Sequence, residues 1–327
     1  MPSWVLKAMT QRLIGFLPNP HYWNELAQTH ITDSIQLPPD QFEVKLGACR
    51  THLEHLRAVR RATPRHFSAL ELGTGWFPVV PIGLFLCGAS PVWTWDIVKH
   101  LRLDRVRFAL NSFLRLDVAR ELERHLPDLL PDRVQKLREV AADRSTMAPA
   151  ELLERLSIHY RIGDVMRSGL PCGSVDLFTS FGVLEYLPSE ALVPLLRAFL
   201  HVAATDAVMS HYVIMEDQHA FFDRAITQFN FLKFSDRAWR WLNNPIIPLN
   251  RLRITDYRRA LRNAGFRITD EAVELRGDPA VLAKVRLARR FRAYPEEDLL
   301  VLRAWLAATP VSKEKTMRSN IEPSSRS

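Results

Sequence analysis

The sequence has few cysteines, and it lacks the spacings that cysteine chemistry requires. The three cysteines, Cys49, Cys87 and Cys172, lie far apart among 327 residues, so they form neither a disulfide framework nor a zinc motif. We therefore expect no metal site, and we expect a reducing, cytoplasmic setting. With 47% hydrophobic and 24% charged residues, the chain can bury a sizeable core.

The glycine patterns of two common nucleotide-binding loops are also missing. Gly73-Thr74-Gly75 starts like the dinucleotide fingerprint G-x-G-x-x-G, but position 78 is proline where the third glycine would stand. The bulky Trp76 and Phe77 would crowd a pyrophosphate at the start of the next helix. No Gly-Lys-Ser/Thr follows Gly75, which excludes a P-loop. NAD and FAD are therefore not expected.

Charged residues are absent between Glu71 and Asp96, a span long enough to suggest a membrane helix. Prolines and glycines interrupt this span, so a buried strand–helix–strand unit explains it better. The amino terminus lacks the pattern of a secretory signal. It could lie on a membrane surface as an amphipathic helix, but packing on its own domain is favoured.

Acidic residues are fewer than basic ones, which gives a net charge of +8. A positive net charge suggests nucleic acid or an anionic membrane surface as a candidate partner. Most of the late arginines fall at helical spacing among apolar residues, as on a solvated helix face, and no RNA-binding module is evident. Nucleic acid is not the expected substrate, and the sequence leaves the oligomeric state open.

The segment from Phe67 to Asp96 carries the clearest signal that is present. It predicts a strand ending at Glu71, a tight turn at Gly73 and Gly75, an apolar helix, and a second strand ending at Asp96. Ligands of a parallel α/β sheet bind beyond the carboxyl ends of its strands. We therefore expect the two carboxylates at neighbouring strand ends, with Asp96 accepting hydrogen bonds from both hydroxyls of a ribose.

Five landmarks in this order resemble those of the class I S-adenosylmethionine (SAM)-dependent methyltransferases. Glu71-Leu72-Gly73-Thr74-Gly75 resembles the first motif, and Asp96 and Asp164 resemble the acids after the second and third strands. The fourth strand, 175–181, with the turn GVLEYLP, and the corner Ala264-Gly265-Phe266 complete the set over roughly positions 66–310. The resemblance implies a doubly wound, Rossmann-like α/β fold with a seven-stranded, mainly parallel sheet, and SAM as cofactor.

The resemblance also implies which residues contact the cofactor. These are Glu71, Gly73, Thr74, Gly75, Asp96, Ile97, Asp164, Val165 and Phe181. For two of the acids a plainer interpretation stands beside this one: Asp96 as a helix cap, and Asp164 as a solvated loop residue.

The chain divides into a helical amino-terminal cap, a core and a tail. The cap covers 1–66, the SAM-binding core 67–311, and a flexible tail 312–327. Within the core, 101–156 predicts extra helices, and 216–254 is an aromatic-rich insertion after the fifth strand, which we call the lid. A further helix is expected at 280–290, before a final strand.

The lid carries the candidates for acceptor chemistry. A hydroxyl acceptor needs a general base, and His219, oriented by Asp217, is the candidate catalytic residue. Arg251 and Arg253 could bind an anionic group of the substrate, and Tyr257 is a third candidate. Ordinary lid hydrogen bonds and salt bridges are the alternative for each.

Three further residues are interpreted as structural. Glu185 and Tyr186 are expected to cap or pack the turn before Pro188, with a substrate role as the alternative, and His211 is expected inside a strand. The predicted activity is O-methylation of a small molecule. Methylation of RNA or protein, or SAM binding without turnover, remain the alternatives.

Overall fold

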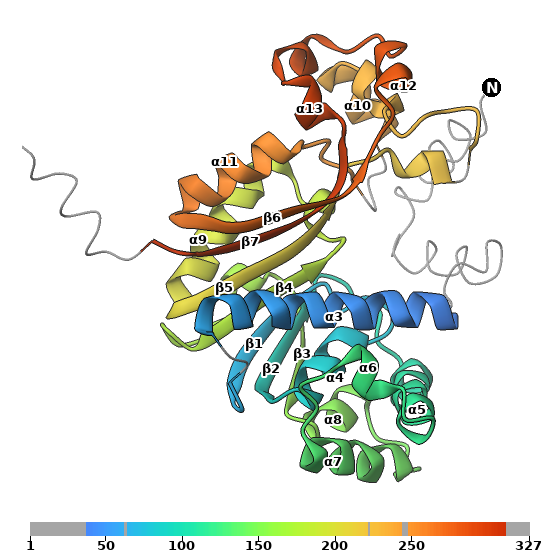
Figure 1. The fold of residues 1–327 in the computed structure, drawn as a ribbon, viewed down its shortest axis with the longest axis vertical. Coiled ribbons are helices and arrows are strands. Elements are labelled where there is room, and N and C mark those ends of the chain that lie inside the picture. The colour runs from blue at the N-terminus through green and yellow to red at the C-terminus, as the bar shows by residue number, and fades with distance from the viewer. Residues whose placement is uncertain (1–36, 62–63, 222, 244–247, 312–327) are drawn as a thin grey trace, which may run out of the picture.

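A computed structural model describes residues 37–61, 64–221, 223–243 and 248–311. These residues form a seven-stranded sheet in the order β3-β2-β1-β4-β5-β7-β6 (Figure 1). The strands are β1 Phe67–Leu72, β2 Ala89–Asp96, β3 Ile158–Ile162, β4 Val175–Phe181, β5 Ala203–Ile214, β6 Phe266–Arg276 and β7 Val301–Pro310. β1 to β5 pair in parallel, whereas β7 runs antiparallel between β5 and β6. The predicted doubly wound, mainly parallel sheet is confirmed.

One face of the sheet is covered by the helices that surround β1 and β2. They are α3 Pro39–Arg60, α4 Val79–Leu86, α5 Leu103–Val118, α6 Leu122–His125, α7 Pro131–Ala142 and α8 Pro149–Glu154. Buried side chains of these helices join those of β1 and β2 in one core, which includes Leu46, Phe85 and Phe113. The helices between β2 and β3 therefore add to this face, and Figure 1 shows them at the lower end of the molecule.

The other face is covered by α9 Leu192–Val202 and α11 Ile254–Ala264. Their apolar residues, among them Phe199 and Leu261, form a second core with β4 and β5. α11 ends at Gly265, whose φ of 95° lets the chain reverse directly into β6.

A third core joins two insertions and includes Leu302 at the start of β7. The lid contributes 3₁₀ helices at Gln218–Phe221 (η4) and Asn230–Lys233 (η5) and the helix α10 Asp236–Leu242. The connection between β6 and β7 contributes α12 Pro279–Ala283, η6 Arg289–Ala293 and α13 Glu296–Leu299. Figure 1 shows both insertions together at the upper end of the molecule. Phe229, Phe231 and Trp239 of the lid pack there with Leu282 and Phe291.

The predicted continuous helix at 280–290 is wrong. The segment is broken into short turns because Leu282 and Phe291 must both reach the third core. Close packing also explains Gly277, where a Cβ would lie 2.2 Å from Phe229 Cζ.

The predicted cap is described only from residue 37 onward, where α3 forms its long helix. Positions 1–36 of that cap and the predicted tail 312–327 lie outside the described residues, so both interpretations stay predictions. Among the helices that the structure describes, none has the length and apolar character to cross a bilayer. The three cysteines are free thiols, with Cys172 exposed.

Candidate functional site

The turn after β1 holds two glycines in left-handed conformations, at φ 84° for Gly73 and 65° for Gly75. Gly73 N–H donates to Trp95 O of β2 at 2.7 Å, so the turn stays against the neighbouring strand. A Cβ at Gly73 would lie 2.4 Å from Val183 Cγ2, whereas one at Gly75 would meet no atom of the described residues within 4 Å. Gly73 therefore serves close packing, and Gly75 leaves room for a ligand beside the backbone.

The two predicted carboxylates lie at neighbouring strand ends, with the glycine turn between them. Asp96 ends β2 and accepts from Gly75 N–H at 3.0 Å. Glu71, near the end of β1, is paired in register with Thr94 and accepts from its hydroxyl at 2.5 Å. Thr94 also contacts the hydroxyl of Thr74. Asp96 is close enough for its charge to raise the pKa of Glu71.

Lys45 joins this cluster from α3 and was not predicted. Burial raises the pKa of Glu71 to about 7, and the nearby ammonium group of Lys45 offsets part of that shift. Burial likewise lowers the pKa of Lys45, against the opposing effect of Glu71. The sequence held one signal for this residue: Lys45 stands among Phe42, Leu46 and Cys49, all of which are buried.

The loop after β3 comes beside the end of β2, since Gly163 N–H donates to Asp96 O at 2.9 Å. Asp164 caps the short helix η1 Val165–Arg167, accepting from Met166 N–H at 3.0 Å, and Val165 is buried. Ile97, which follows Asp96, is 79% exposed. The structure thus brings Asp164 and Ile97 to the edge that holds Asp96.

Phe181 ends β4 on the other side of the glycine turn and stacks on Tyr212 of β5, with ring centroids 4.5 Å apart. The Phe181 ring therefore packs against aromatic side chains of β5 and β7.

Asp217 and His219 come together just after β5. Asp217 is fully buried, and its Oδ1 contacts His219 Nδ1 at 2.9 Å and the His219 N–H at 3.0 Å. Asn230 Nδ2 donates to the other carboxylate oxygen at 2.8 Å. A carboxylate against Nδ1 favours the tautomer that leaves Nε2 as the basic nitrogen. Sequence spacing alone does not predict this contact.

Arg253 makes structural contacts. It is fully buried, and its guanidinium donates to the carbonyls of Met215, Leu299 and Val301. Burial lowers its pKa to about 10. Arg253 therefore ties the end of β5 to the start of β7.

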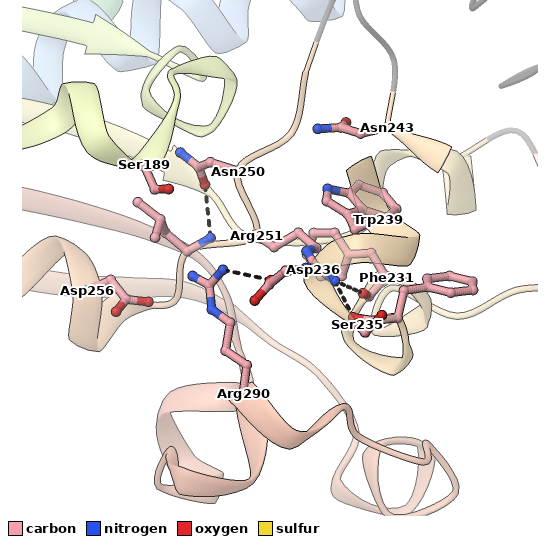
Figure 2. Close-up of polar contacts among 12 residues, drawn as sticks. Ser189, Phe231, Ser235, Asp236, Trp239, Asn243, Asn250, Arg251, Asp256 and Arg290 are labelled. Carbon is pink, nitrogen blue, oxygen red and sulfur yellow. Dashed lines mark hydrogen bonds and ion pairs between the residues drawn. The ribbon is translucent and has the colours of Figure 1, made fainter. Parts of the chain in front are cut away.

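Arg251 also makes structural contacts, which join segments within the lid. It donates to the carbonyl oxygens of Phe231 and Phe234 and to Asp236, at 2.6 Å for the carboxylate (Figure 2). Arg290 also contacts Asp236, at 3.3 Å, so this carboxylate links the two insertions. These contacts support structural roles for Arg251 and Arg253, and the predicted role of both arginines in substrate binding stays a prediction.

Tyr257 and His211 both lie in the interior. Tyr257 is 2% exposed and points its hydroxyl toward Asn250 Oδ1 at 3.4 Å. His211 contacts Ser180 Oγ at 2.8 Å through Nδ1, and burial lowers its pKa to about 4. The prediction of His211 inside a strand is confirmed, and the position of Tyr257 supports a packing role.

Among the described residues, no group of three or more histidine, cysteine or acidic side chains could hold a metal ion.

A cavity of about 610 Å³, lined by His55, Asp206 and Asp270 among others, lies by the amino end of β5. That edge is opposite the one that carries the predicted site.

Neither a protein-family model nor a curated protein matches this chain. Solved structures similar to it include a SAM-dependent methyltransferase from Methanosarcina mazei, at 12% identity and a TM-score of 0.44 over 78% of this chain and 98% of that one. Another is geranyl diphosphate C-methyltransferase from Streptomyces coelicolor A3(2), bound to Mg²⁺, geranyl diphosphate and S-adenosyl-L-homocysteine, at 10% identity and 0.42 over 80% and 79%. A third is magnesium protoporphyrin IX methyltransferase from Synechocystis PCC 6803, with S-adenosyl-L-homocysteine bound, at 15% identity and 0.41 over 84% and 89%.

The sheet itself assigns the fold. Five parallel strands, with the antiparallel β7 inserted between β5 and β6, form the doubly wound, mainly parallel seven-stranded sheet that the sequence predicts. The fold that the sequence resemblance implies is therefore present, and what the protein does with it depends on the residues at the carboxyl ends of the strands.

Proposed function

We propose that this protein transfers the methyl group of SAM to a hydroxyl group of a small molecule. The observation that carries the proposal is the pair of carboxylates, Glu71 and Asp96, at adjacent strand ends beside the open space over Gly75. This arrangement offers acceptors for a ribose and backbone without side chains for a close ligand.

The residues present fit the cofactor. Asp96 would accept from the ribose hydroxyls, because each carboxylate oxygen can accept more than the single backbone bond it has here. Glu71 and Lys45 together present a negative and a positive group, which match the ammonium and carboxylate of an amino acid. Asp164 would lie on the adenine side. When bound, SAM supplies an activated methyl group on a positively charged sulfur.

His219 is the proposed base for the acceptor hydroxyl. A hydroxyl has a pKa far above neutral, so a positioned base adds roughly 10²–10⁴-fold to the rate. Asp217 holds the imidazole through Nδ1 and is itself fixed by Asn230. The lid, which begins directly after β5 and carries His219, is anchored through the third core. An anchored lid supports exclusion of water from the reaction.

Two measurements test the proposal. Calorimetric titration should show binding of SAM and of S-adenosyl-L-homocysteine, and failure of both would refute the cofactor assignment. Incubation of methyl-labelled SAM with a small-molecule extract of the source cells should then label a compound of low mass. Label that enters only RNA or protein would support the macromolecular alternative, and binding without any transfer would support a SAM-binding protein without turnover.

A further inference from the structure

The turn after β4, residues 182–187, lies where the cofactor loop meets the lid. Val183 packs over Gly73, since a Cβ on that glycine would lie 2.4 Å from Val183 Cγ2. Tyr186 at the other end donates its hydroxyl to Gln218 Oε1 at 2.7 Å. Gln218 precedes His219 in η4, so the turn borders both the proposed cofactor site and the proposed base.

The backbone of this turn is held firmly by Asn250. Its N–H donates to Glu185 O at 2.9 Å, and its side-chain amide donates to Leu184 O at 2.8 Å and Leu187 O at 3.0 Å. Asn250 therefore satisfies three carbonyl groups of the turn and holds its geometry without help from the Glu185 side chain.

The carboxyl group of Glu185 is buried and lacks a partner. The residue is 3% exposed, and neither Oε1 nor Oε2 has a hydrogen-bond partner among the described residues. Oε1 lies 3.4 Å from the position a Cβ on Gly182 would take, which places it at the carboxyl end of β4. Buried carboxyl oxygens are nearly always paired, so this one calls for an explanation.

Within the part of the chain that the structure describes, no cation acts on the Glu185 carboxyl group to balance a negative charge. Burial raises its pKa to about 8, and the backbone N–H groups of Glu185 and Ile214, which come near without normal hydrogen-bond geometry, offset only part of that shift. The titratable neighbours are the hydroxyls of Tyr186 and Tyr257; burial raises the pKa of both, and the charge of Glu185 adds to that shift. A group from outside the protein that donates hydrogen bonds would satisfy both oxygens.

We propose that Glu185 recognises the methyl acceptor, accepting hydrogen bonds from a hydroxyl or amine group that the acceptor carries next to the site of methylation. This inference rests on the proposed function and deepens it: the substrate class is a small molecule with a donor group beside the reacting oxygen. Glu185 then fixes the acceptor, while His219 takes the proton. Loss of the recognition contact should weaken acceptor binding and leave the chemical step in place.

The test measures label transfer from methyl-labelled SAM to the small-molecule extract, as a function of extract concentration. For Glu185→Leu we expect the half-saturating extract concentration to rise at least about 30-fold, with the maximal rate within roughly 3-fold of wild type. Glu185→Gln separates the two donors. A hydroxyl can still donate to the amide oxygen, so its shift stays below about 5-fold, whereas a cationic amine loses its counter-charge and shifts as far as in Glu185→Leu.

The pH dependence gives an independent readout. In wild type, the half-saturating concentration should fall as the pH rises through about 8, because the carboxylate accepts more strongly than the neutral acid. Glu185→Gln should lose this dependence, and it keeps the test available if Glu185→Leu does not fold.

Controls separate this proposal from the proposed function. Glu190→Gln makes the same charge change at an exposed residue five positions along and should match wild type. SAM affinity should stay within about 2-fold in every variant. A folded Glu185→Leu with unchanged half-saturation, or a pH dependence that persists in Glu185→Gln, would overturn the recognition role while SAM binding and transfer stand. If wild type transfers no label, both proposals fall.

Discussion

The carboxyl ends of β1 and β2 and those of β4 and β5 are organised in different ways. At the first pair, the contacts join residues about twenty positions apart, as between Gly75 and Asp96 or Glu71 and Thr94. At the second pair they span far more of the chain: Asn250 contacts Leu184, and Arg303 contacts Glu216 across 87 positions. The glycine turn and its two strand-end acids are thus built by one local unit, and the acceptor side by insertions that fold together.

This difference predicts where substitutions act. Changes on the acceptor side should disturb the fold or turnover, whereas changes to the cofactor-facing groups, Asp96 and Gly75, should act on SAM affinity.

The largest effect is expected from Arg253→Met. The substitution leaves three buried carbonyl groups, of Met215, Leu299 and Val301, without their donor. At about 1–3 kcal/mol for each orphaned group, we expect the free energy of unfolding to fall by roughly 4 kcal/mol in urea titrations. Arg259→Met, on the exposed side of α11, is the control and should stay within about 0.5 kcal/mol. A loss below about 1 kcal/mol in Arg253→Met would argue that this guanidinium does not join the two segments.

The next effect is on turnover. His219→Ala should lower the rate of label transfer at least about 100-fold, because it removes the proposed base. SAM affinity should be nearly unchanged, since His219 belongs to the segment after β5 and not to the glycine turn. Asp217→Asn keeps the size of the side chain and should lower the rate less, as it removes only the charge against Nδ1. A His219→Ala variant with wild-type turnover would refute the base assignment.

Asp96→Asn should act on the cofactor side alone. Its lost charge weakens the expected hydrogen bonds to the ribose, and we expect SAM affinity to fall by about 2 kcal/mol, roughly 30-fold, in calorimetric titration. At saturating SAM, turnover should recover to near the wild-type rate. Asp164→Asn, on the neighbouring loop, serves as the comparison and should weaken binding less. Equal affinities for Asp96→Asn and wild type would contradict the central assignment.

The same contrast explains how much the sequence could predict. The strand–turn–helix–strand unit from Phe67 to Asp96 was predictable because period, glycines and strand-end acids all lie within thirty residues. The sequence predicts that Asp217 orients His219. It does not predict the geometry of their contact, because Asn230, thirteen positions along the chain, fixes the Asp217 carboxylate. From the sequence alone, Arg251 and Arg253 are candidates for binding an anionic ligand. The tertiary contacts show that Arg253 donates to backbone carbonyls, and that Arg251 donates to backbone carbonyls and to Asp236.

The partnership between the lid and residues 277–300 could not be predicted either. Neither insertion has a strong periodic pattern, and the two bury aromatic residues in one shared core, as Phe231 and Phe291 do. For Lys45, the sequence shows the unusual residue but not its partner. A lysine on the apolar side of a helix is a visible anomaly, but its partner, Glu71, is identified only once α3 crosses the sheet.

The smallest expected effect separates the two glycines of the turn. Gly75→Ala imposes a left-handed conformation on alanine, which costs about 1 kcal/mol, and its Cβ meets no protein atom within 4 Å. Gly73→Ala carries the same conformational cost and also drives a methyl group into Val183, so its unfolding free energy should fall further. Gly75→Ala should therefore weaken SAM binding more than it weakens the fold, and Gly73→Ala should do the reverse. If Gly75→Ala binds SAM as tightly as wild type, the open space over Gly75 is not where the cofactor lies.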